Sequence, residues 1–195
     1  MPKMVLAIDP SLRGTGYALL EGNDAKVRCL EYGVINNHPK LTAPACLVAI
    51  HEKLTTLIET YHPEAMALEN IIYVQSYTTA IALGSARGVA LLTAARAGLT
   101  IHEYTPKRVK QAVVGRGAAA KTQVSFMVRA LLGLTETPPN DAADAIAVGL
   151  THLRNRVVLV PSSTPLLAMH LKKKGNVSAA WKKIISLQAD SQAKG

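Results

Sequence analysis

The sequence predicts an α/β fold in which a mixed five-stranded sheet is flanked by helices. Short apolar runs typical of strands fill the N-terminal part, and from about residue 47 such runs alternate with segments of helical period. This order, three strands and then alternating helices and strands, indicates an antiparallel meander joined to parallel strands. Hydrophobic residues make up 49% of the 195 residues and aromatic ones 4%, so the core is expected to be aliphatic and rich in alanine.

Three strands are predicted first. Met4–Ile8 is an apolar run that stops at Asp9, where turn-forming Pro, Ser and Gly residues follow. Gly16–Glu21 and Lys26–Ile35 are two further strand-like runs, and Gly22-Asn23-Asp24 between them predicts a hairpin loop.

Helical spacing then runs from Leu47 to Tyr61, and His62-Pro63 ends that element. The later elements are predicted as a strand over Ala65–Leu68 that ends at Glu69, a helix over 77–97, a strand over Thr100–Tyr104, and helices over 106–114, 121–132 and 140–155. The character changes beyond Asn155. We therefore expect one domain over residues 1–155 and a basic, partly flexible C-terminal appendage over 156–195.

The positive charge is concentrated in the second half of the chain. The formal net charge is +9, and residues 104–135 carry six bases and no acid. This balance favours a polyanionic partner, either nucleic acid or an anionic membrane surface. Cys29 and Cys46 form neither a CxxC motif nor a disulfide framework, and no signal peptide or membrane-spanning run is apparent. We expect a soluble, cytoplasmic protein that does not bind a membrane.

Four carboxylates are placed where a site could form. Asp9 and Glu69 each end a predicted strand, and neighbouring parallel strands present the same end, so both should face one cleft. Asp141 and Asp144 share one face at the start of a predicted helix. Clustered carboxylates repel one another unless a cation neutralises them, and an all-oxygen ligand set suits Mg²⁺ better than zinc. The pattern predicts a two-metal site for phosphodiester hydrolysis.

Each carboxylate also has an ordinary structural explanation. Asp9 before Pro10 is a common turn starter, and Glu69 could mark where a strand reaches water. Asp141 could serve the positive end of a helix dipole, which explains Asp144 less well because it lies one turn deeper. A metal site accounts for all four residues at once, whereas the structural explanations require four coincidences.

An ordered set of motifs resembles the RuvC family of Holliday-junction resolvases. Ala7–Pro10 and Gly14–Tyr17 resemble the family's opening motif. The resemblance continues after Glu69 with Leu83–Leu91, the basic segments Tyr104–Lys110, Val114–Gly117 and Lys121–Val124, and the acidic motif Asp141–Ala147, with His152 just after it. It runs in order from about residue 4 to 154, nearly four-fifths of the chain, which makes the set far more specific than any one motif.

The resemblance implies a ribonuclease-H-like fold and a crossover junction endodeoxyribonuclease that makes paired symmetric nicks across a four-way junction in recombination and repair. It implies a homodimer and two Mg²⁺ per active site, which Mn²⁺ can replace. A branch-migration motor complex is a further candidate partner. Asp9, Glu69, Asp141 and Asp144 carry over as catalytic metal ligands, and Lys110 and Lys121 as catalytic cations beside the scissile or neighbouring phosphate.

The residues expected to contact DNA are Lys107, Arg108, Arg116, Ile72, Tyr73, Ser76 and Arg87. A solvated helix face explains Lys107 and Arg108 equally well. The 77–97 helix is the expected dimer interface, because Gly84, Gly88, Ala90 and Ala94 permit close approach, although packing on the sheet is also consistent with them.

This chain departs from the family pattern at two positions in its motifs. Ser11 stands where the family usually has Gly after the first Asp-Pro, which predicts a reshaped turn. Ile72 stands where the family places an aromatic residue three positions after the catalytic Glu, and Tyr73 follows it. We expect Ile72 to act as an aliphatic wedge at the junction centre and Tyr73 to supply the stacking surface.

Three other protein classes fit the sequence less well. An ATPase or sugar kinase of the actin–hexokinase type needs a second Asp-Gly phosphate loop and a Gly-rich adenosine site, and the sequence has neither. A non-catalytic junction-binding module would lack one of the carboxylates, and all four are present. The basic motifs from 104 to 124 argue against a transposase or ribonuclease H on the same metal core.

Overall fold

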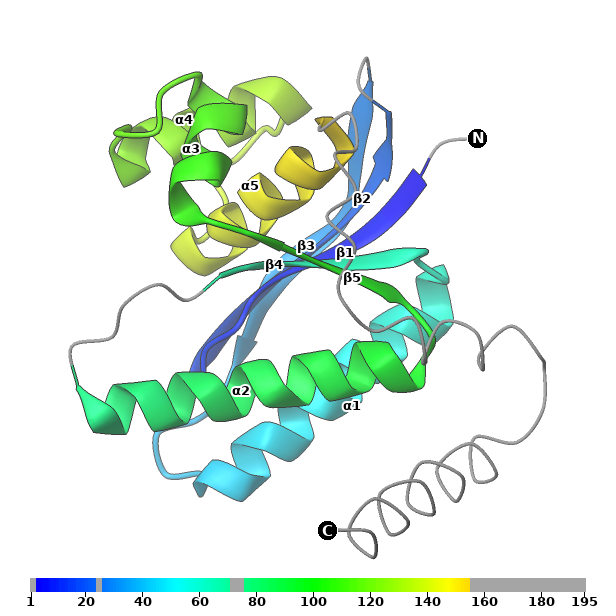
Figure 1. The fold of residues 1–195 in the computed structure, drawn as a ribbon, viewed down its shortest axis with the longest axis vertical. Coiled ribbons are helices and arrows are strands. Elements are labelled where there is room, and N and C mark those ends of the chain that lie inside the picture. The colour runs from blue at the N-terminus through cyan, green and yellow to red at the C-terminus, as the bar shows by residue number, and fades with distance from the viewer. Residues whose placement is uncertain (1–2, 24–25, 71–75, 155–195) are drawn as a thin grey trace, which may run out of the picture. The chain divides into compact units, whose positions relative to one another are not determined.

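The protein contains a five-stranded mixed sheet with helices on both faces (Figure 1). The computed structural model describes residues 3–23, 26–70 and 76–154. In chain order the elements are β1 Lys3–Asp9, β2 Gly14–Gly22, β3 Val27–Asn36, α1 Ala43–Tyr61, β4 Ala65–Glu69, α2 Tyr77–Arg96, β5 Thr100–Tyr104, α3 Pro106–Val114, α4 Lys121–Leu132 and α5 Asn140–Arg154. The predicted appendage over 156–195 lies outside the described residues.

The strand order is β3-β2-β1-β4-β5, as the predicted meander and crossovers require. β1 pairs antiparallel with β2, and β2 with β3, whereas β1–β4 and β4–β5 are parallel. The mixed sheet predicted from the sequence is therefore confirmed. A bulge between Leu19 and Leu20 interrupts the β2–β3 register and leaves the half-exposed Leu30 of β3 without a partner on β2, an irregularity that the sequence did not predict.

Alternate side chains of the strands build two separate cores. Val5 and Ala7 of β1 pack under α3, α4 and α5, whereas Leu6 and Ile8 pack under α1 and α2. Figure 1 shows these two helical layers on opposite faces of the sheet. Successive side chains of a strand point to opposite faces of the sheet. The parity of a residue, meaning whether its position along the strand is odd or even, therefore decides which helical layer it faces.

The helices begin and end close to the predicted positions, with one exception. α1 begins at Ala43, four residues before the predicted periodic stretch, with Thr42 as an extended N-cap and a proline in its first turn. Proline is favoured in a first helical turn because it has no N–H to leave unpaired. Its first two residues, Ala43 and Pro44, are exposed, so hydrophobic spacing could not mark the start of the helix.

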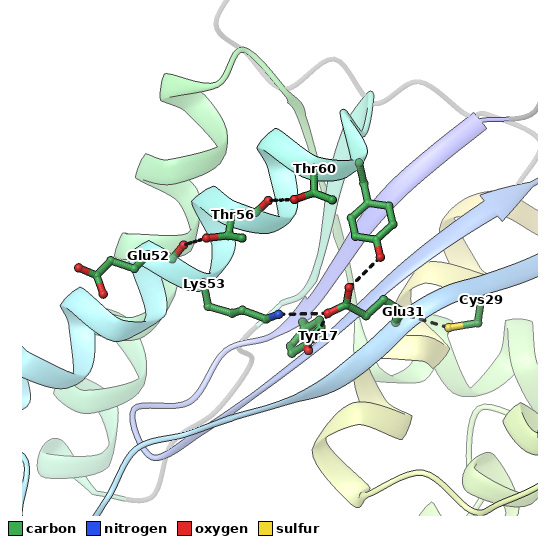
Figure 2. A network of polar contacts seen from close by, with 8 residues as sticks. Tyr17, Cys29, Glu31, Glu52, Lys53, Thr56 and Thr60 are labelled. Atoms are coloured by element: carbon green, nitrogen blue, oxygen red, sulfur yellow. Dashed lines mark hydrogen bonds and ion pairs between the residues drawn. The ribbon is translucent and has the colours of Figure 1, made fainter.

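A polar network fastens α1 to the sheet at the side of β3 (Figure 2). Glu31 of β3 accepts hydrogen bonds from the Tyr17 hydroxyl at 3.0 Å, Lys53 at 3.1 Å and the Tyr61 hydroxyl at 2.8 Å. Lys53 also lies 5.0 Å from the centre of the Tyr17 ring. These bonds hold the pKa of Glu31 below its ordinary value despite desolvation, which acts to raise it. The network joins three elements on the face of the sheet that α1 and α2 cover, opposite the face of Asp9 and Glu69.

α2 carries an apolar face that the rest of the described chain does not cover. Ala86, Ala90 and Ala94 face the domain, whereas Tyr77 is 92% exposed, Ile81 70% and Leu92 49%. Together with Gly84 and Gly88, these exposed residues form what we call the outer stripe of α2 (Tyr77, Ile81, Gly84, Gly88 and Leu92).

The outer stripe changes two of the expectations made for this helix. Ala90 and Ala94 are fully buried against the domain, so the prediction that they help form an interface is wrong, and only Gly84 and Gly88 face outward. By length and composition alone, α2 is the one helix in the described ranges that could cross a membrane, with a mean hydropathy of 1.3. The sequence predicted no such segment. These two properties are weak evidence for a membrane span, because α2 packs on α1 and the sheet as one layer of the domain.

Candidate active site

The ends of β1 and β4 bring Asp9 and Glu69 to one face of the sheet. Each residue ends its strand, and the parallel register pairs Ile8 with Leu68, so the residues that follow are neighbours. Asp9 has the parity of Val5 and Ala7, and Glu69 has that of Ala65 and Ala67, which all belong to the core beneath α5. Both carboxylates therefore face the layer that contains α5.

α5 brings Asp141 and Asp144 to the same place. Its first turn packs on β2, where a Cβ built on Gly16 would overlap the backbone carbonyl of Asp141. A Cβ on Gly14 would lie 2.9 Å from Oδ2 of Asp141. Further along, the small Gly149 lies against Ala7 and Leu20, so the whole helix lies close to the sheet. The sequence motifs included Gly14 and Gly16 without a role, and the structure gives them one: they make room for α5.

The four carboxylates interact electrostatically. Burial, and then the charges of Asp144, Glu69 and Asp141, together raise the pKa of Asp9 to about 7, against the lowering effect of Lys121. Burial and the Asp144 charge likewise raise the pKa of Glu69, while Lys121 and Lys110 lower it. Three motifs that are far apart in the sequence therefore meet in one acidic cluster.

The chemistry of this cluster fits a hard divalent cation. All four side chains offer carboxylate oxygens, and the raised pKa of Asp9 reflects burial and then repulsion by its acidic neighbours, both of which a bound cation would offset. As these side chains stand, no group of three or more His, Cys, Asp or Glu residues within 3–23, 26–70 and 76–154 is gathered tightly enough to hold a metal ion. The cation that contacts the cluster is Lys121, whose Nζ lies 3.0 Å from Oδ2 of Asp144.

Lys110 and Lys121 both lie beside the carboxylates. Lys121 begins α4 with its side chain 81% exposed, whereas the Asp144 side chain is 27% exposed. Lys110 lies on α3, close enough for its charge to lower the pKa of Glu69. The other basic residues predicted for DNA, Lys107, Arg108 and Arg116, are exposed on α3 and on the connection between α3 and α4.

Arg87 has a different environment from the other predicted DNA contacts. Its side chain is 15% exposed, and its Nη2 lies 2.6 Å from Oε1 of Glu103. Its Nη1 donates a hydrogen bond to the backbone carbonyl of Glu69 at 3.3 Å. This arrangement favours a role within the domain. Ser76 is the N-cap of α2 and accepts from the Thr79 N–H at 3.2 Å. The predicted wedge residues, Ile72 and Tyr73, lie outside the described residues.

The turn after Asp9 is held by hydrogen bonds that the sequence did not predict. Thr15 donates to the carbonyl of Ser11, and the Ser11 N–H donates back to the Thr15 hydroxyl at 3.2 Å. Arg13 donates to the carbonyl of His38, and the Asn37 amide donates to the carbonyl of Leu12. Among described residues other than glycine, only His62 has a positive φ, so this turn does not need a glycine at Ser11.

Comparison with known proteins places the chain in one family. The family model for the crossover junction endodeoxyribonuclease RuvC matches residues 5–152. The chain is 52% identical over 170 residues to the crossover junction endodeoxyribonuclease RuvC of Akkermansia muciniphila, covering 87% of this chain and 98% of that one. It is 46% identical over 152 residues to the RuvC of Syntrophomonas wolfei, covering 77% of this chain and 88% of the relative.

Solved structures agree with the sequence comparison. The structure of T. thermophilus RuvC in complex with Holliday junction substrate matches with a TM-score of 0.73 and 36% identity, covering 77% of this chain and 92% of that chain. The family model covers more than half of the chain, and the relatives exceed 40% identity over most of their length. With its ribonuclease-H-like sheet and the ordered carboxylate motifs, the chain belongs to the RuvC family of crossover junction endodeoxyribonucleases.

Proposed function

We propose that this protein resolves four-way DNA junctions by paired symmetric nicks in recombination and DNA repair. The observation that carries the proposal is the convergence of Asp9, Glu69, Asp141 and Asp144 on one sheet face, where burial and then the charges of the other three raise the pKa of Asp9 to about 7. Membership of the RuvC family supports the same activity, and the T. thermophilus relative is bound to a Holliday junction substrate.

The acidic cluster is proposed as the metal site. Nucleases of this family are metal-dependent, and we propose two Mg²⁺ per active site, held by the four carboxylates and replaceable by Mn²⁺. When bound, such ions activate a water and stabilise the leaving oxygen in phosphodiester hydrolysis.

The protein positions the carboxylates of the site and places positive charge beside them. Asp141 and Asp144 are carried on a helix held against the sheet through Gly16, so their places depend on backbone packing and not on a flexible loop. Lys110 and Lys121 supply positive charge beside the carboxylates, where the backbone of the scissile strand has to lie. A fixed cation next to a phosphate stabilises the extra negative charge that develops during its hydrolysis.

The basic residues of α3, α4 and their connection are proposed to bind DNA. Residues 104–135 contain six bases and no acid, and Lys107, Arg108 and Arg116 are exposed. Affinity from such contacts comes mainly from neutralising phosphates and falls as salt rises. Ser76, at the start of α2, is proposed as a further contact. Ile72 and Tyr73 are proposed as the aliphatic wedge and the stacking surface at the junction centre.

The proposed assembly is a homodimer that forms through the outer stripe of α2. A four-way junction offers two equivalent strands, and a two-fold dimer matches them with identical sites. The stripe's exposed Tyr77, Ile81 and Leu92 support this choice of surface. We further propose that the protein acts in the cytoplasm, that a branch-migration motor can deliver the junction, and that the basic residues of 156–195 form an appendage that adds affinity for DNA.

Incubation of the protein with a synthetic four-way junction and Mg²⁺ tests the proposal, with each strand labelled in turn. We expect nicks at symmetric positions on two opposite strands, none in EDTA, and none on a linear duplex of the same sequence. Nicks on the duplex at a similar rate would instead indicate a nuclease without junction selectivity.

A further inference from the structure

The peptide group that joins Glu69 to Asn70 is held from both sides. Its carbonyl oxygen accepts a hydrogen bond from Nη1 of Arg87 at 3.3 Å. Its N–H donates to the backbone carbonyl of Tyr104 at 2.7 Å. Fixing this peptide plane fixes the ψ angle of Glu69. The direction in which the Glu69 side chain projects from the end of β4 is then fixed as well.

Arg87 is itself held in place by an acid on the next strand. Its Nη2 lies 2.6 Å from Oε1 of Glu103, a residue of β5 that pairs with Leu68 of β4. The Arg87 side chain is 15% exposed and the Glu103 side chain 38%. The planar guanidinium uses one nitrogen for the carboxylate and the other for the carbonyl. A lysine ammonium is a point charge on a flexible stem and lacks this fixed fork.

The guanidinium acts on the backbone of Glu69 from the face opposite its carboxylate. Leu68 belongs to the core beneath α1 and α2, and its register partner Glu103 shares that face, whereas Glu69 faces α5. The cations that lower the pKa of the Glu69 carboxyl are Lys121 and Lys110, from the α5 side. The charge of Arg87 is balanced by Glu103, so Arg87 acts on Glu69 by holding its backbone carbonyl and not through its charge.

We propose that Arg87 and Glu103 form a clamp that holds the Glu69–Asn70 peptide and so positions the Glu69 carboxylate for cleavage. This assigns Arg87 a positioning role in place of the DNA contact expected from the sequence, and it rests on the proposed junction-cleaving function. The two roles make opposite predictions for Glu103. Removing its charge would release Arg87 for DNA if Arg87 were a phosphate contact, but it would loosen Glu69 if the pair is a clamp.

The test compares Arg87→Gln, Arg87→Lys and Glu103→Gln with the parent protein. Arg96→Gln is the matched control, because Arg96 is an exposed arginine in the last turn of the same helix. Three quantities are measured: the single-turnover cleavage rate at saturating junction, the junction Kd as a function of salt, and hydrogen–deuterium exchange at the Asn70 amide in the free protein. Circular dichroism verifies that each variant is folded.

We expect Arg87→Gln and Glu103→Gln each to slow cleavage by about 10- to 100-fold, the scale of a small misplacement of a reacting group. The junction Kd and its salt dependence should stay at parent values, whereas loss of a phosphate contact would change the log–log slope by about 0.9. Both variants should exchange the Asn70 amide faster than the parent and Arg96→Gln. Arg87→Lys, which keeps the charge beside Glu103 but not the second hydrogen bond, should fall between.

A flatter salt dependence in Arg87→Gln, with tighter binding and full cleavage in Glu103→Gln, would overturn the clamp and restore the DNA contact. Unchanged exchange at Asn70 in both variants would overturn it as well. The exchange measurement needs neither DNA nor metal. A parent protein that fails to cut junctions would therefore refute the proposed function, while the exchange result would still decide on the clamp.

Discussion

Gly16 of β2 lies so close to Asp141 of α5 that no other residue fits there without moving the helix. An ideal Cβ on Gly16 would overlap the Asp141 carbonyl carbon and oxygen and lie 3.1 Å from the Ala142 nitrogen. These are backbone atoms, which cannot turn aside as a side chain can. The position of the α5 carboxylates relative to Asp9, which pairs with Gly16 in the sheet, is therefore set by a glycine.

Replacing Gly16 should damage both the fold and the cleavage activity. We expect Gly16→Ala to lower the free energy of unfolding by about 1–3 kcal/mol, the usual cost of overpacking a core, and to slow cleavage by displacing α5. Urea denaturation and single-turnover cleavage are the measurements. Gly14→Ala is the matched comparison, because its Cβ would meet the movable Asp141 side chain. It should slow cleavage while leaving stability near the parent value, and equal stability losses in the two variants would contradict this account.

The four carboxylates should be needed for cleavage but not for junction binding. Asp9→Asn, Glu69→Gln, Asp141→Asn and Asp144→Asn keep the shape of each side chain but remove the charge that would hold a metal ion. We expect each variant to lose cleavage and to bind the junction at least as tightly as the parent, because negative charge facing DNA is removed. Gel-shift and cleavage assays on one junction test this. Cleavage at the parent rate by any variant would exclude that residue from the metal site.

The carboxylate cluster could be predicted from the sequence because it follows from strand ends. Asp9 and Glu69 each follow a buried run, and parallel neighbours bring such ends together, so no coordinates were needed to expect them side by side. Asp141 and Asp144 were predictable from their helical spacing beside small residues. Gly14 and Gly16 gave a weaker signal: two small residues on one face of a strand indicate that a backbone packs there, but not which one.

The environment of Arg87 could not be predicted from the sequence. Its position in a family motif and its charge indicated a DNA contact, whereas the structure pairs it with Glu103 on β5. That pairing depends on the register between β4 and β5 and on the rotation of α2 about its axis. Neither is encoded locally. Ala90 and Ala94 show the same limit, because small residues permit close packing on either side of a helix and only the tertiary structure chooses the side.

Asp9 should make the metal-free protein less stable as the pH rises from about 4 to about 7. Its pKa is raised from 3.8 to about 7, chiefly by burial, so the folded state retains a proton that the unfolded state has released. The free energy of unfolding therefore falls with rising pH across this window and levels off above it. Asp9→Asn should remove this slope and be more stable than the parent at pH 8, by about 1.4 kcal/mol for each unit of pKa shift removed.

Urea midpoints in EDTA at several pH values between 4 and 8 test this prediction. Glu59→Gln is the control, since Glu59 is an exposed carboxylate on α1 and should leave the pH dependence unchanged. Curves for Asp9→Asn and the parent that stay parallel over the whole range would show that Asp9 does not carry the extra proton.

A charge in the outer stripe of α2 should break the proposed dimer. Ile81 is 70% exposed and lies between Tyr77 and Gly84 in the stripe. A two-fold interface would bury the Ile81 side chain of each protomer. We expect Ile81→Glu to weaken self-association at least about tenfold, because buried apolar anchors typically contribute about 2 kcal/mol or more. Sedimentation velocity measures this. Phe126→Glu is the control, since Phe126 is 61% exposed on α4, in the other helical layer. A parent protein that is monomeric with and without junction would refute the dimer.

His152 should make the protein less stable as the pH falls, whereas Asp9 should make it less stable as the pH rises. Its Nδ1 lies 2.8 Å from the Tyr104 hydroxyl, and its ring centre lies 4.6 Å from that of His102. Burial, then the neighbouring charges of His102 and Lys3, lower the pKa of His152 from 6.5 to about 4. The folded state keeps the imidazole neutral while the unfolded state takes up a proton, so stability is full above pH 6.5 and is lost as the pH falls toward 4.

Because the Asp9 and His152 windows overlap, the His152 prediction is best tested in the Asp9→Asn background. There, the free energy of unfolding should fall as the pH drops from 6.5 to 4, and adding His152→Gln should flatten that slope while lowering stability at pH 7. Tyr104→Phe removes only the hydroxyl and should cost about 1 kcal/mol at pH 7, the usual net value of one hydrogen bond. His38→Gln, at an exposed histidine, is the control. A slope that persists in the His152→Gln variant would show that the acid sensitivity arises elsewhere in the protein.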